Sequence, residues 1–387
     1  MNKICIIGGC GHVGLPLGLA FASKGFFVTL VDLNSSAIDK VNKGELPFKE
    51  DGAEELLKSL VPKKIIASND ITLVKNQDVV IFVTGTPVDE HHTPKINEVL
   101  KVIRSYKKSL SKEQLIILRS TLFPGSTELI VKELENLLEE TKLAFCPERI
   151  LQGKALEEIF ALPQIVAANS DKAYNEAAEL FLKISPKIIR MEPREAELVK
   201  LMTNTWRYLE FAVSNAFYMI AENDGLDFYK IYKAIKDDYP RAKHFPSAGL
   251  TAGPCLFKDT MQLSAFYQNN FFLGQSAMLV NEGLPNFLIQ QLEKKLGSLA
   301  EKQIALLGMT FKANNDDTRV SLSFKIKKIL EFRMAKVLTH DPYLQNKMSL
   351  QETINSADGI ILGVPHDEYK GIVPTAPYID CWGIWPR

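Results

Sequence analysis

A glycine-rich turn between two apolar runs restricts the possible fold of this chain more than any other feature. The run Lys3–Ile7 leads into the hexapeptide GCGHVG at 9–14, a complete G-x-G-x-x-G pattern. An apolar helical pattern covers about 15–23, and a second apolar run at 27–31 ends at Asp32. Strand, glycines, helix, strand and acid in this order predict a βαβ unit with parallel strands.

Each part of this pattern suits a dinucleotide. Gly9 allows the tight turn, Gly11 lets a pyrophosphate approach the backbone, and Gly14 lets helix and strand pack closely. The helix N-terminus faces the phosphates. Asp32 would accept hydrogen bonds from the ribose and repel a 2′-phosphate, which favours NAD over NADP. The alternative is a βαβ unit without a ligand. The predicted cofactor contacts in this unit are Gly9, Gly11, His12, Val13, Gly14 and Asp32.

Composition and charge narrow the class of protein. Lys+Arg and Asp+Glu both number 46, so the net charge is zero and predicts no nucleic-acid partner. The apolar runs are too short to span a bilayer, and the chain enters a strand at once, so we expect neither membrane insertion nor a signal peptide. Five scattered cysteines without C-x-x-C favour a reducing cytoplasm and no zinc site. The adjacent His91 and His92 indicate a solvated loop rather than metal ligands.

Alternating strands and helices predict an α/β protein in three segments. We expect an N-terminal Rossmann domain at 1–190, a central helical region at 191–298 and a C-terminal Rossmann-like domain at 299–387. The centre contains one long helical pattern from Glu195 to about Asp224, with Gly225 as its C-cap. Further apolar runs, each a predicted strand of a parallel sheet, lie at 78–83, 115–118, 143–145, 303–308, 337–342 and 359–364.

Polar, turn-forming residues follow the predicted strands of the first domain. Because ligands bind at the carboxyl ends of parallel strands, these residues are candidates for the site. Those assigned to the cofactor are Thr84, Thr86, Ser120 and Thr121, and those assigned to the substrate are Glu148 and Arg149. Lys200 and Asn204 are four positions apart in the long helix, so they share one of its faces.

Cys255 has the surroundings of a reactive thiol. Gly253 and Pro254 form a predicted turn before it, and a helix start there would favour the thiolate through backbone N–H groups and the helix dipole. Lys258 and Asp259 follow within four positions. The alternative is a small buried hydrophobic side chain.

Together these residues resemble the UDP-glucose/GDP-mannose dehydrogenase family of nucleotide-sugar dehydrogenases, over nearly the whole chain. The matching motifs are the glycine turn, Asp32-Leu33-Asn34, Ser120-Thr121 with Pro124-Gly125, Pro147-Glu148 with Gly153, Lys200-x-x-x-Asn204, Gly253-x-Cys255-x-x-Lys258-Asp259, Gly308-x-x-Phe311-Lys312 and Asp317-Thr318-Arg319. The resemblance implies an NAD domain, a central dimerisation region and a nucleotide-binding domain. It also implies oxidation of the sugar C6 alcohol to a carboxylate in two NAD-dependent steps.

The resemblance also implies a role for each candidate residue. Lys200, Asp259 or an ordered water takes the C6 hydroxyl proton, and Asn204 polarises the oxygen. Cys255 captures the aldehyde and forms a thioester, which water hydrolyses with Glu148 or Asp259 as base. Thr121 is assigned to the water or to Glu148, and Lys200 also to the oxyanions. Lys312 and Arg319 would meet the UDP phosphates or shape the nucleotide site.

Several positions depart from the family pattern and bear on the sugar. Arg149 after Glu148 is similar to the branch that handles N-acetylated hexosamines, whereas the Lys258-Asp259 pair is similar to the UDP-glucose enzymes. Trp382 stands where the UDP-glucose branch often has Arg. We expect UDP-N-acetylmannosamine as substrate, with UDP-glucose as the alternative. Arg149 would donate to the acetamido group or else serve a structural role.

Two other classes of protein compete with this interpretation. A two-electron dehydrogenase of the hydroxyisobutyrate or 6-phosphogluconate type needs neither Cys255 nor a domain at 303–364. A non-catalytic NAD- or UDP-sugar-binding protein would not need Lys200, Asn204, Cys255 and Asp259 together. We therefore expect a cytoplasmic homodimeric enzyme of polysaccharide biosynthesis.

Overall fold

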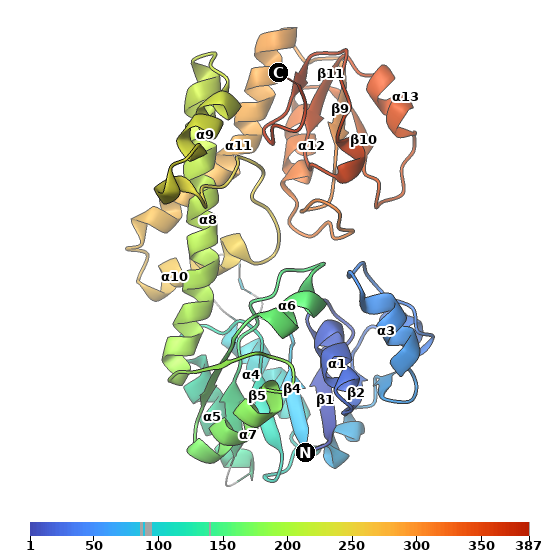
Figure 1. The fold of residues 1–387 in the computed structure, drawn as a ribbon, viewed down its shortest axis with the longest axis vertical. Coiled ribbons are helices and arrows are strands. Elements are labelled where there is room, and N and C mark those ends of the chain that lie inside the picture. The colour runs from blue at the N-terminus through green and yellow to red at the C-terminus, as the bar shows by residue number, and fades with distance from the viewer. Residues whose placement is uncertain (86–87, 90–94, 139–140, 387) are drawn as a thin grey trace. The chain divides into compact units, whose positions relative to one another are not determined.

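The computed structural model describes residues 1–85, 88–89, 95–138 and 141–386. It divides into two compact units, residues 1–202 and 203–387, and the boundary lies inside the helix α8 (Pro193–Asn223). Each unit contains one sheet flanked by helices, as Figure 1 shows. The division into three domains at 190 and 298 stays a prediction.

The sheet of the N-terminal unit has the strand order β3-β2-β1-β4-β5-β6-β7-β8. The glycine turn follows its first strand, and Lys3 pairs with Phe27 as predicted for a parallel βαβ unit. Strands such as VVIF at 79–82 are buried on both faces, which explains their continuous apolar runs. The strands are β1 (Lys3–Ile7), β2 (Phe27–Val31), β3 (Ile65–Ser68), β4 (Val79–Phe82), β5 (Leu115–Leu118), β6 (Lys142–Phe145), β7 (Gln164–Ala168) and β8 (Ile188–Arg190).

One strand pairing corrects the prediction of a fully parallel sheet. β7 runs antiparallel to β6, with Phe145 opposite Ala167, whereas the other described pairings of this sheet are parallel. The connection from β6 to β7 contains a single short helix of seven residues, α6 (Ala155–Ala161), and does not return the chain to the opposite edge. Parallel pairing needs such a crossover.

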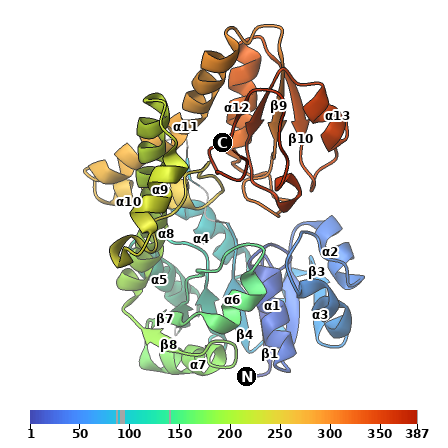
Figure 2. The same ribbon diagram turned by 45° about the horizontal axis from the view of Figure 1, so that its top comes forward.

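Helices cover both faces of this sheet. The face that carries Ile4, Ile6 and Leu30 packs against α1, α2, α3, α6 and α7, and Figure 2 shows α1 and α6 on this same side. The face that carries Ile7 and Phe82 packs against α4 and α5. The bounds not yet given are α1 (Gly14–Ser23), α2 (Ser35–Asn42), α3 (Ala53–Leu60), η1 (Ile71–Asn76), α4 (Ile96–Ser105), α5 (Ser126–Leu138) and α7 (Asp171–Phe181).

The sheet of the C-terminal unit has the order β10-β9-β11-β12, and its described pairings are parallel. One face packs against α8, α9, α11 and α12, and the other against α13, Tyr369 and Trp385. The elements are α9 (Phe228–Lys236), η2 (Pro240–Ala242), α10 (Leu256–Phe266), α11 (Phe272–Leu296), β9 (Gln303–Leu307), α12 (Leu322–Phe332), β10 (Lys336–His340), α13 (Leu350–Asn355), β11 (Gly359–Leu362), η3 (Asp367–Tyr369) and β12 (Tyr378–Ile379).

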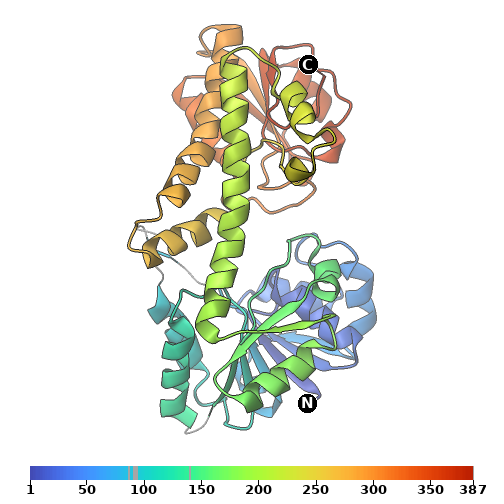
Figure 3. The same cartoon turned by 60° about the vertical axis from the view of Figure 1, so that its left-hand side comes forward.

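The long helix α8 agrees with the predicted segment from Glu195 to about Asp224. Figure 3 shows it as one uninterrupted helix, and its 31 residues contain neither Gly nor Pro after Pro193 at the first position. Proline suits a first helical position. Gly225, beyond the end of the helix, has a φ of 73°, which is typical of a glycine that ends a helix. None of the described helices has the length and apolar character needed to cross a bilayer.

Candidate active site

The turn after β1 has the geometry that a dinucleotide needs. A Cβ atom at Gly14 would lie 2.5 Å from the carbonyl oxygen of Gly8, so only glycine lets α1 start this close to the turn. At Gly11 the nearest such atom is 3.7 Å away, which leaves the backbone open to a ligand. The predicted functions of these two glycines, packing and access, therefore fit the structure.

Asp32 lies directly after β2 and beside this turn. Its Oδ2 accepts the N–H of Cys10 at 2.9 Å, and its Oδ1 accepts the N–H of Asn34 at 3.0 Å. A carboxylate has about four acceptor positions, so Asp32 retains the capacity to bind ribose hydroxyls. His12 stacks on Phe48 with ring centroids 3.9 Å apart. These residues fit NAD.

The strand-end residues differ in what surrounds them. The hydroxyl of Ser120 donates to the carbonyl oxygen of Thr84, which joins the ends of β5 and β4. Thr121 follows Ser120 and is half-buried. Thr86 lies outside the described residues, as do His91 and His92.

Glu148 is held in place by a buried arginine that the sequence interpretation missed. Arg119, 2% exposed, forms an ion pair with Oε2 of Glu148, and its guanidinium also donates to Gln164 at 2.9 Å. Oε1 of Glu148 accepts the backbone N–H groups of Arg149 and Ile150. The cavity beside this pair has a volume of about 10 Å³, room for one water and not for a sugar.

Arg149 points its guanidinium at the protein framework, where it donates to the carbonyl oxygen of Pro163. Burial lowers the pKa of Arg149, and the charge of Glu148 partly offsets this effect. These contacts favour the structural alternative for Arg149 over contact with the sugar.

On α8, buried polar side chains mark one face. Lys200 is 9% exposed and Asn204 is 6% exposed, so neither is a solvated surface residue. One turn earlier, the buried Glu197 accepts the N–H groups of Gly125 and Thr127 at 2.6 and 2.7 Å. This contact ties the part of α8 next to Lys200 to the loop after Thr121.

In the C-terminal unit, Asn204 lies against Asp259 of α10. The Asn204 amide donates to Oδ2 of Asp259 at 2.6 Å, and Asp259 is fully buried. Its Oδ1 makes no hydrogen bond to any described residue, although Nζ of Lys258 lies 3.7 Å away. A buried carboxylate oxygen of this kind is suited to accept a proton.

Cys255 is the N-cap of α10, as the turn before it predicted. Of the five cysteines, all of them described, only Cys255 is exposed. Burial raises the pKa of Cys5, Cys10 and Cys146 to about 12, so these thiols are inert. The exposed helix-start position is typical of reactive cysteines.

The loop before Cys255 rests on residues that local sequence patterns did not reveal. The side-chain amide of Asn215 on α8 exchanges two hydrogen bonds with the backbone of Gly249, at 3.0 and 2.8 Å. Trp382 packs on the same glycine, where a Cβ would lie 2.1 Å from Cζ3. Nearer the thiol, the N–H of Gly253 donates to the carbonyl oxygen of Val320 at 3.2 Å.

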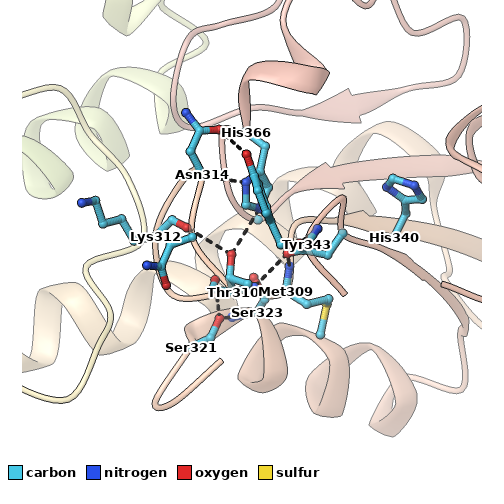
Figure 4. Close-up of polar contacts among 12 residues, drawn as sticks. Met309, Thr310, Lys312, Asn314, Ser321, Ser323, His340, Tyr343 and His366 are labelled. Atoms are coloured by element: carbon cyan, nitrogen blue, oxygen red, sulfur yellow. Dashed lines mark hydrogen bonds and ion pairs between the residues drawn. The ribbon is translucent and has the colours of Figure 1, made fainter. Parts of the chain in front are cut away.

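The loop after β9 carries both predicted phosphate-binding residues. Arg319 is paired with Asp317 in its own loop, with NH2 and Oδ2 2.6 Å apart. This hydrogen bond raises the pKa of Arg319, and burial offsets the effect only in part. Figure 4 shows the side chain of Lys312 directed away from a polar cluster around His366 and Thr310.

A dinucleotide turn in one unit and an exposed helix-capping cysteine beside a buried carboxylate in the other define the class of an NAD-dependent oxidoreductase. Three models of the UDP-glucose/GDP-mannose dehydrogenase family match the chain. These are its NAD binding domain at 2–185, its central domain at 194–282 and its UDP binding domain at 305–387.

Similar proteins point in the same direction. The UDP-N-acetyl-D-mannosamine dehydrogenase of Pyrococcus horikoshii is 31% identical over 96% of this chain and 91% of its own. The solved UDP-D-ManNAc dehydrogenase from Pyrococcus horikoshii has a TM-score of 0.89 at 30% identity, covering 96% of this chain and 91% of that one. A UDP-glucose dehydrogenase from Pyrobaculum islandicum has a TM-score of 0.91 at 25% identity, covering 99% and 95%.

The chain belongs to the UDP-glucose/GDP-mannose dehydrogenase family. It is an NAD-dependent nucleotide-sugar dehydrogenase with a domain that binds the UDP-sugar. The predicted family, α/β fold class and cofactor are thereby confirmed.

Proposed function

We propose that this enzyme oxidises C6 of UDP-N-acetyl-D-mannosamine to the carboxylate. Relatives of that name match over nearly the full length, and the first of them is 31% identical. The observation that supports four-electron chemistry is Cys255, exposed at the start of α10 and followed by the buried pair of Asp259 and Asn204. The TM-score of 0.91 to a UDP-glucose dehydrogenase makes UDP-glucose the second candidate.

NAD, when bound, accepts the hydride in each oxidation. The glycine turn would hold its pyrophosphate and Asp32 its ribose, with Thr84, Ser120 and Thr121 nearby in the strand-end loops. The charge of Asp32 would disfavour the 2′-phosphate of NADP.

In the first oxidation, the C6 hydroxyl proton passes to Asp259, Lys200 or an ordered water. The buried Oδ1 of Asp259, which accepts no hydrogen bond from a described residue, supports its candidacy. Asn204 donates a hydrogen bond to Oδ2, the other oxygen of this carboxylate, and thereby orients the Asp259 side chain. The charge of Lys200 would stabilise oxyanions.

Before the second oxidation, the thiolate of Cys255 attacks the C6 aldehyde carbon. A C–S bond forms, and the carbonyl oxygen takes a proton. Loss of the second hydride, together with the hydroxyl proton, turns this thiohemiacetal into a thioester. Water then adds, the C–S bond breaks, and the products are the carboxylate and the regenerated thiol. Glu148 or Asp259 is the proposed base for this water, and Thr121 the residue that holds it.

The test is NADH formation across UDP-sugars by the wild-type enzyme and by the Cys255→Ser variant. Wild type should release two NADH per sugar and prefer UDP-N-acetylmannosamine in kcat/KM. The variant should lose at least ~100-fold in uronate formation yet still bind NAD, because the first oxidation does not use the thiol. Cys381→Ser, at a buried cysteine, is the matched control. A Cys255→Ser variant with wild-type turnover would remove the thiol from the mechanism. A preference of the wild-type enzyme for UDP-glucose would change the proposed substrate from UDP-N-acetylmannosamine to UDP-glucose.

The proposed assembly is a homodimer formed around α8. Trp206 and Ile220 on this helix are 62% and 68% exposed, and Val213 and Phe217 are also exposed. Apolar surface of this extent on one helix indicates an interface. Sedimentation at micromolar concentration should give twice the mass of 43.4 kDa. Scattered free cysteines support the further proposal of a cytoplasmic location. The UDP-sugar substrate supports the proposal of a place in polysaccharide biosynthesis.

A further inference from the structure

A single buried histidine ties together the loops that follow three strands of the C-terminal sheet. His366, fully buried, lies in the loop after β11, and Figure 4 shows it against Asn314 and Thr310 of the loop after β9. Its Nδ1 lies 3.0 Å from the backbone N of Asn314, and its Nε2 lies 3.1 Å from Oδ2 of Asp341, which directly follows β10. These loops share the carboxyl edge of the sheet, where ligands bind.

The hydrogen bonds define which ring nitrogen of His366 carries the proton. The N–H of Asn314 donates to Nδ1, so that nitrogen carries no proton. The proton is therefore on Nε2, which donates to the carboxylate of Asp341. Thr310 lies 3.2 Å from the same nitrogen, and its hydroxyl donates to the carbonyl oxygen of Lys312 at 3.1 Å. A neutral histidine thus bridges a backbone donor and a buried carboxylate.

Asp341 occupies the second and third backbone donors of the loop after β9, because Gly308 donates to His340. Its Oδ2 accepts the N–H groups of Met309 at 2.6 Å and Thr310 at 3.0 Å. In many nucleotide-binding folds the corresponding N–H groups bind a phosphate. A protein carboxylate takes them here, so these two N–H groups are not available to a phosphate. Lys312 is the first cation further along the loop.

We propose that His366 is a positioning residue that fixes segment 309–314 and thereby presents Lys312 to the nucleoside diphosphate. The proposal rests on the proposed function in that it takes Lys312 as a phosphate contact. His366 itself does not touch the ligand. The anchored segment is ordered before binding, so ligand binding does not have to order it.

Removing the imidazole should weaken nucleotide binding rather than slow the chemistry. In His366→Leu, Asn314 loses its acceptor and Asp341 loses one donor, so the segment is free to leave its bound conformation. In His366→Gln, a side-chain oxygen and an N–H group can replace both contacts of the neutral ring. A general structural role would affect NAD and UDP equally, whereas a positioning role affects UDP alone.

The matched control is a second buried histidine of the same unit. His340 is 5% exposed and its Nδ1 lies 3.0 Å from the Tyr369 hydroxyl, and Figure 4 shows it apart from the cluster that holds Lys312. His340→Leu therefore removes a buried imidazole of similar size without releasing segment 309–314.

The experiment is calorimetric titration of the full-length variants with UDP and separately with NAD, together with steady-state kinetics. For His366→Leu we expect the Kd for UDP and the KM for the UDP-sugar to rise about tenfold, as follows from leaving one buried donor unpaired. Its kcat should fall less than about threefold, and NAD affinity should not change. His366→Gln and His340→Leu should stay within about threefold of wild type for UDP.

The possible results separate the two proposals. Wild-type UDP affinity in His366→Leu, or equal losses for UDP and NAD, would overturn the positioning role. Equal UDP losses in His366→Leu and His340→Leu would do the same. A wild-type enzyme that binds UDP but oxidises no UDP-sugar would overturn the proposed function. The UDP titrations of the variants would then still decide the role of His366. Absence of UDP binding by the wild type would overturn both.

Discussion

The two sheets place an aspartate at the same topological point and use it in opposite ways. Asp32 directly follows β2 and Asp341 directly follows β10, each the parallel neighbour of the first strand of its unit. The first residue after that strand also makes the same bond in both: Gly8 N donates to Val31, and Gly308 N to His340, each at 2.8 Å.

The difference lies in how many protein groups each carboxylate binds. Asp32 is half-buried and takes one N–H group from the glycine turn, that of Cys10. Asp341 is fully buried and takes two from its turn, as well as the imidazole of His366. One acid remains available to a ribose, and the other is an internal anchor. The same βαβ start therefore leaves an accessible acid in the NAD binding domain and a fully enclosed one in the UDP binding domain.

The strongest test of this contrast is Asp341→Ala. It leaves the N–H groups of Met309 and Thr310 and the imidazole of His366 without their acceptor, in a fully buried place. We expect the free energy of unfolding of the C-terminal unit to fall by about 3–5 kcal/mol. Urea denaturation followed by tryptophan fluorescence measures it, since Trp206, Trp382 and Trp385, the three tryptophans of the chain, all lie in residues 203–387. A loss below about 1 kcal/mol would contradict the anchoring role.

The counterpart is Asp32→Ala, which should affect the ligand rather than the fold. Because Asp32 is half-buried, the free energy of unfolding should change by less than about 1 kcal/mol. The Kd for NAD should rise by about 10- to 100-fold, since hydrogen bonds between the ribose and a charged acceptor are lost. The ratio of NAD to NADP affinity should narrow. Asp32→Asn is the control that keeps the shape of the side chain and removes its charge. If the ratio of NAD to NADP affinity is unaltered in both variants, another residue binds the ribose.

Acid should weaken the two units to different degrees, and this is the smallest of the expected effects. Burial raises the pKa of Asp341, but hydrogen bonds from His366, Tyr343 and Met309 outweigh it, so the net pKa lies below the usual value. Burial lowers the pKa of His340. Both groups bind protons more readily in the unfolded chain. Their stabilisation is present at neutral pH and is lost as pH falls, below about 6.5 for His340 and below about 3.9 for Asp341.

Two buried carboxyls of the N-terminal unit respond to acid in the opposite way. Burial raises the pKa of Glu50 and of Glu197, and their hydrogen bonds offset this only in part. These carboxyls bind protons more readily when folded, so their contribution to stability grows as pH falls. Between pH 7 and 5 we expect protonation of His340 in the unfolded chain to lower the stability of the C-terminal unit, seen as a tryptophan-fluorescence midpoint at higher pH than the circular-dichroism midpoint. Coincident midpoints would contradict this difference.

Local sequence patterns were sufficient for the parts of the fold with regular periodicity. The glycine turn, α8 and the strands before the polar loops lie where the apolar runs predicted them. The sequence analysis missed β3, β7, β8 and β12. The strands IIAS and QIVAA contain alanine and polar residues, which are weak strand formers, and β8 and β12 are only three and two residues long. The antiparallel direction of β7 was missed because the strand itself was not predicted.

The candidate site was only partly predictable, because side-chain partners are chosen across long sequence distances. An Asp directly after an apolar run looks the same at 32 and at 341, and what distinguishes them is His366, 25 residues after the second acid. Likewise, the arginine that holds Glu148 comes from the end of β5, 29 positions earlier. The residue types of Cys255, Asn204 and Asp259 were recognisable, whereas the contact between Asn204 and Asp259 required the structure.

The contact between Gly249 and Trp382 has an evolutionary consequence. No side chain fits at 249 while the indole packs there, because even a Cβ would lie 2.1 Å from it. The indole is also fixed by its own N–H group, which donates to the carbonyl oxygen of Gly363 at 3.1 Å. A lineage can therefore acquire a larger residue at 249 only after Trp382 has been replaced. Among related chains, the two positions should change together, although they lie 133 positions apart in the sequence.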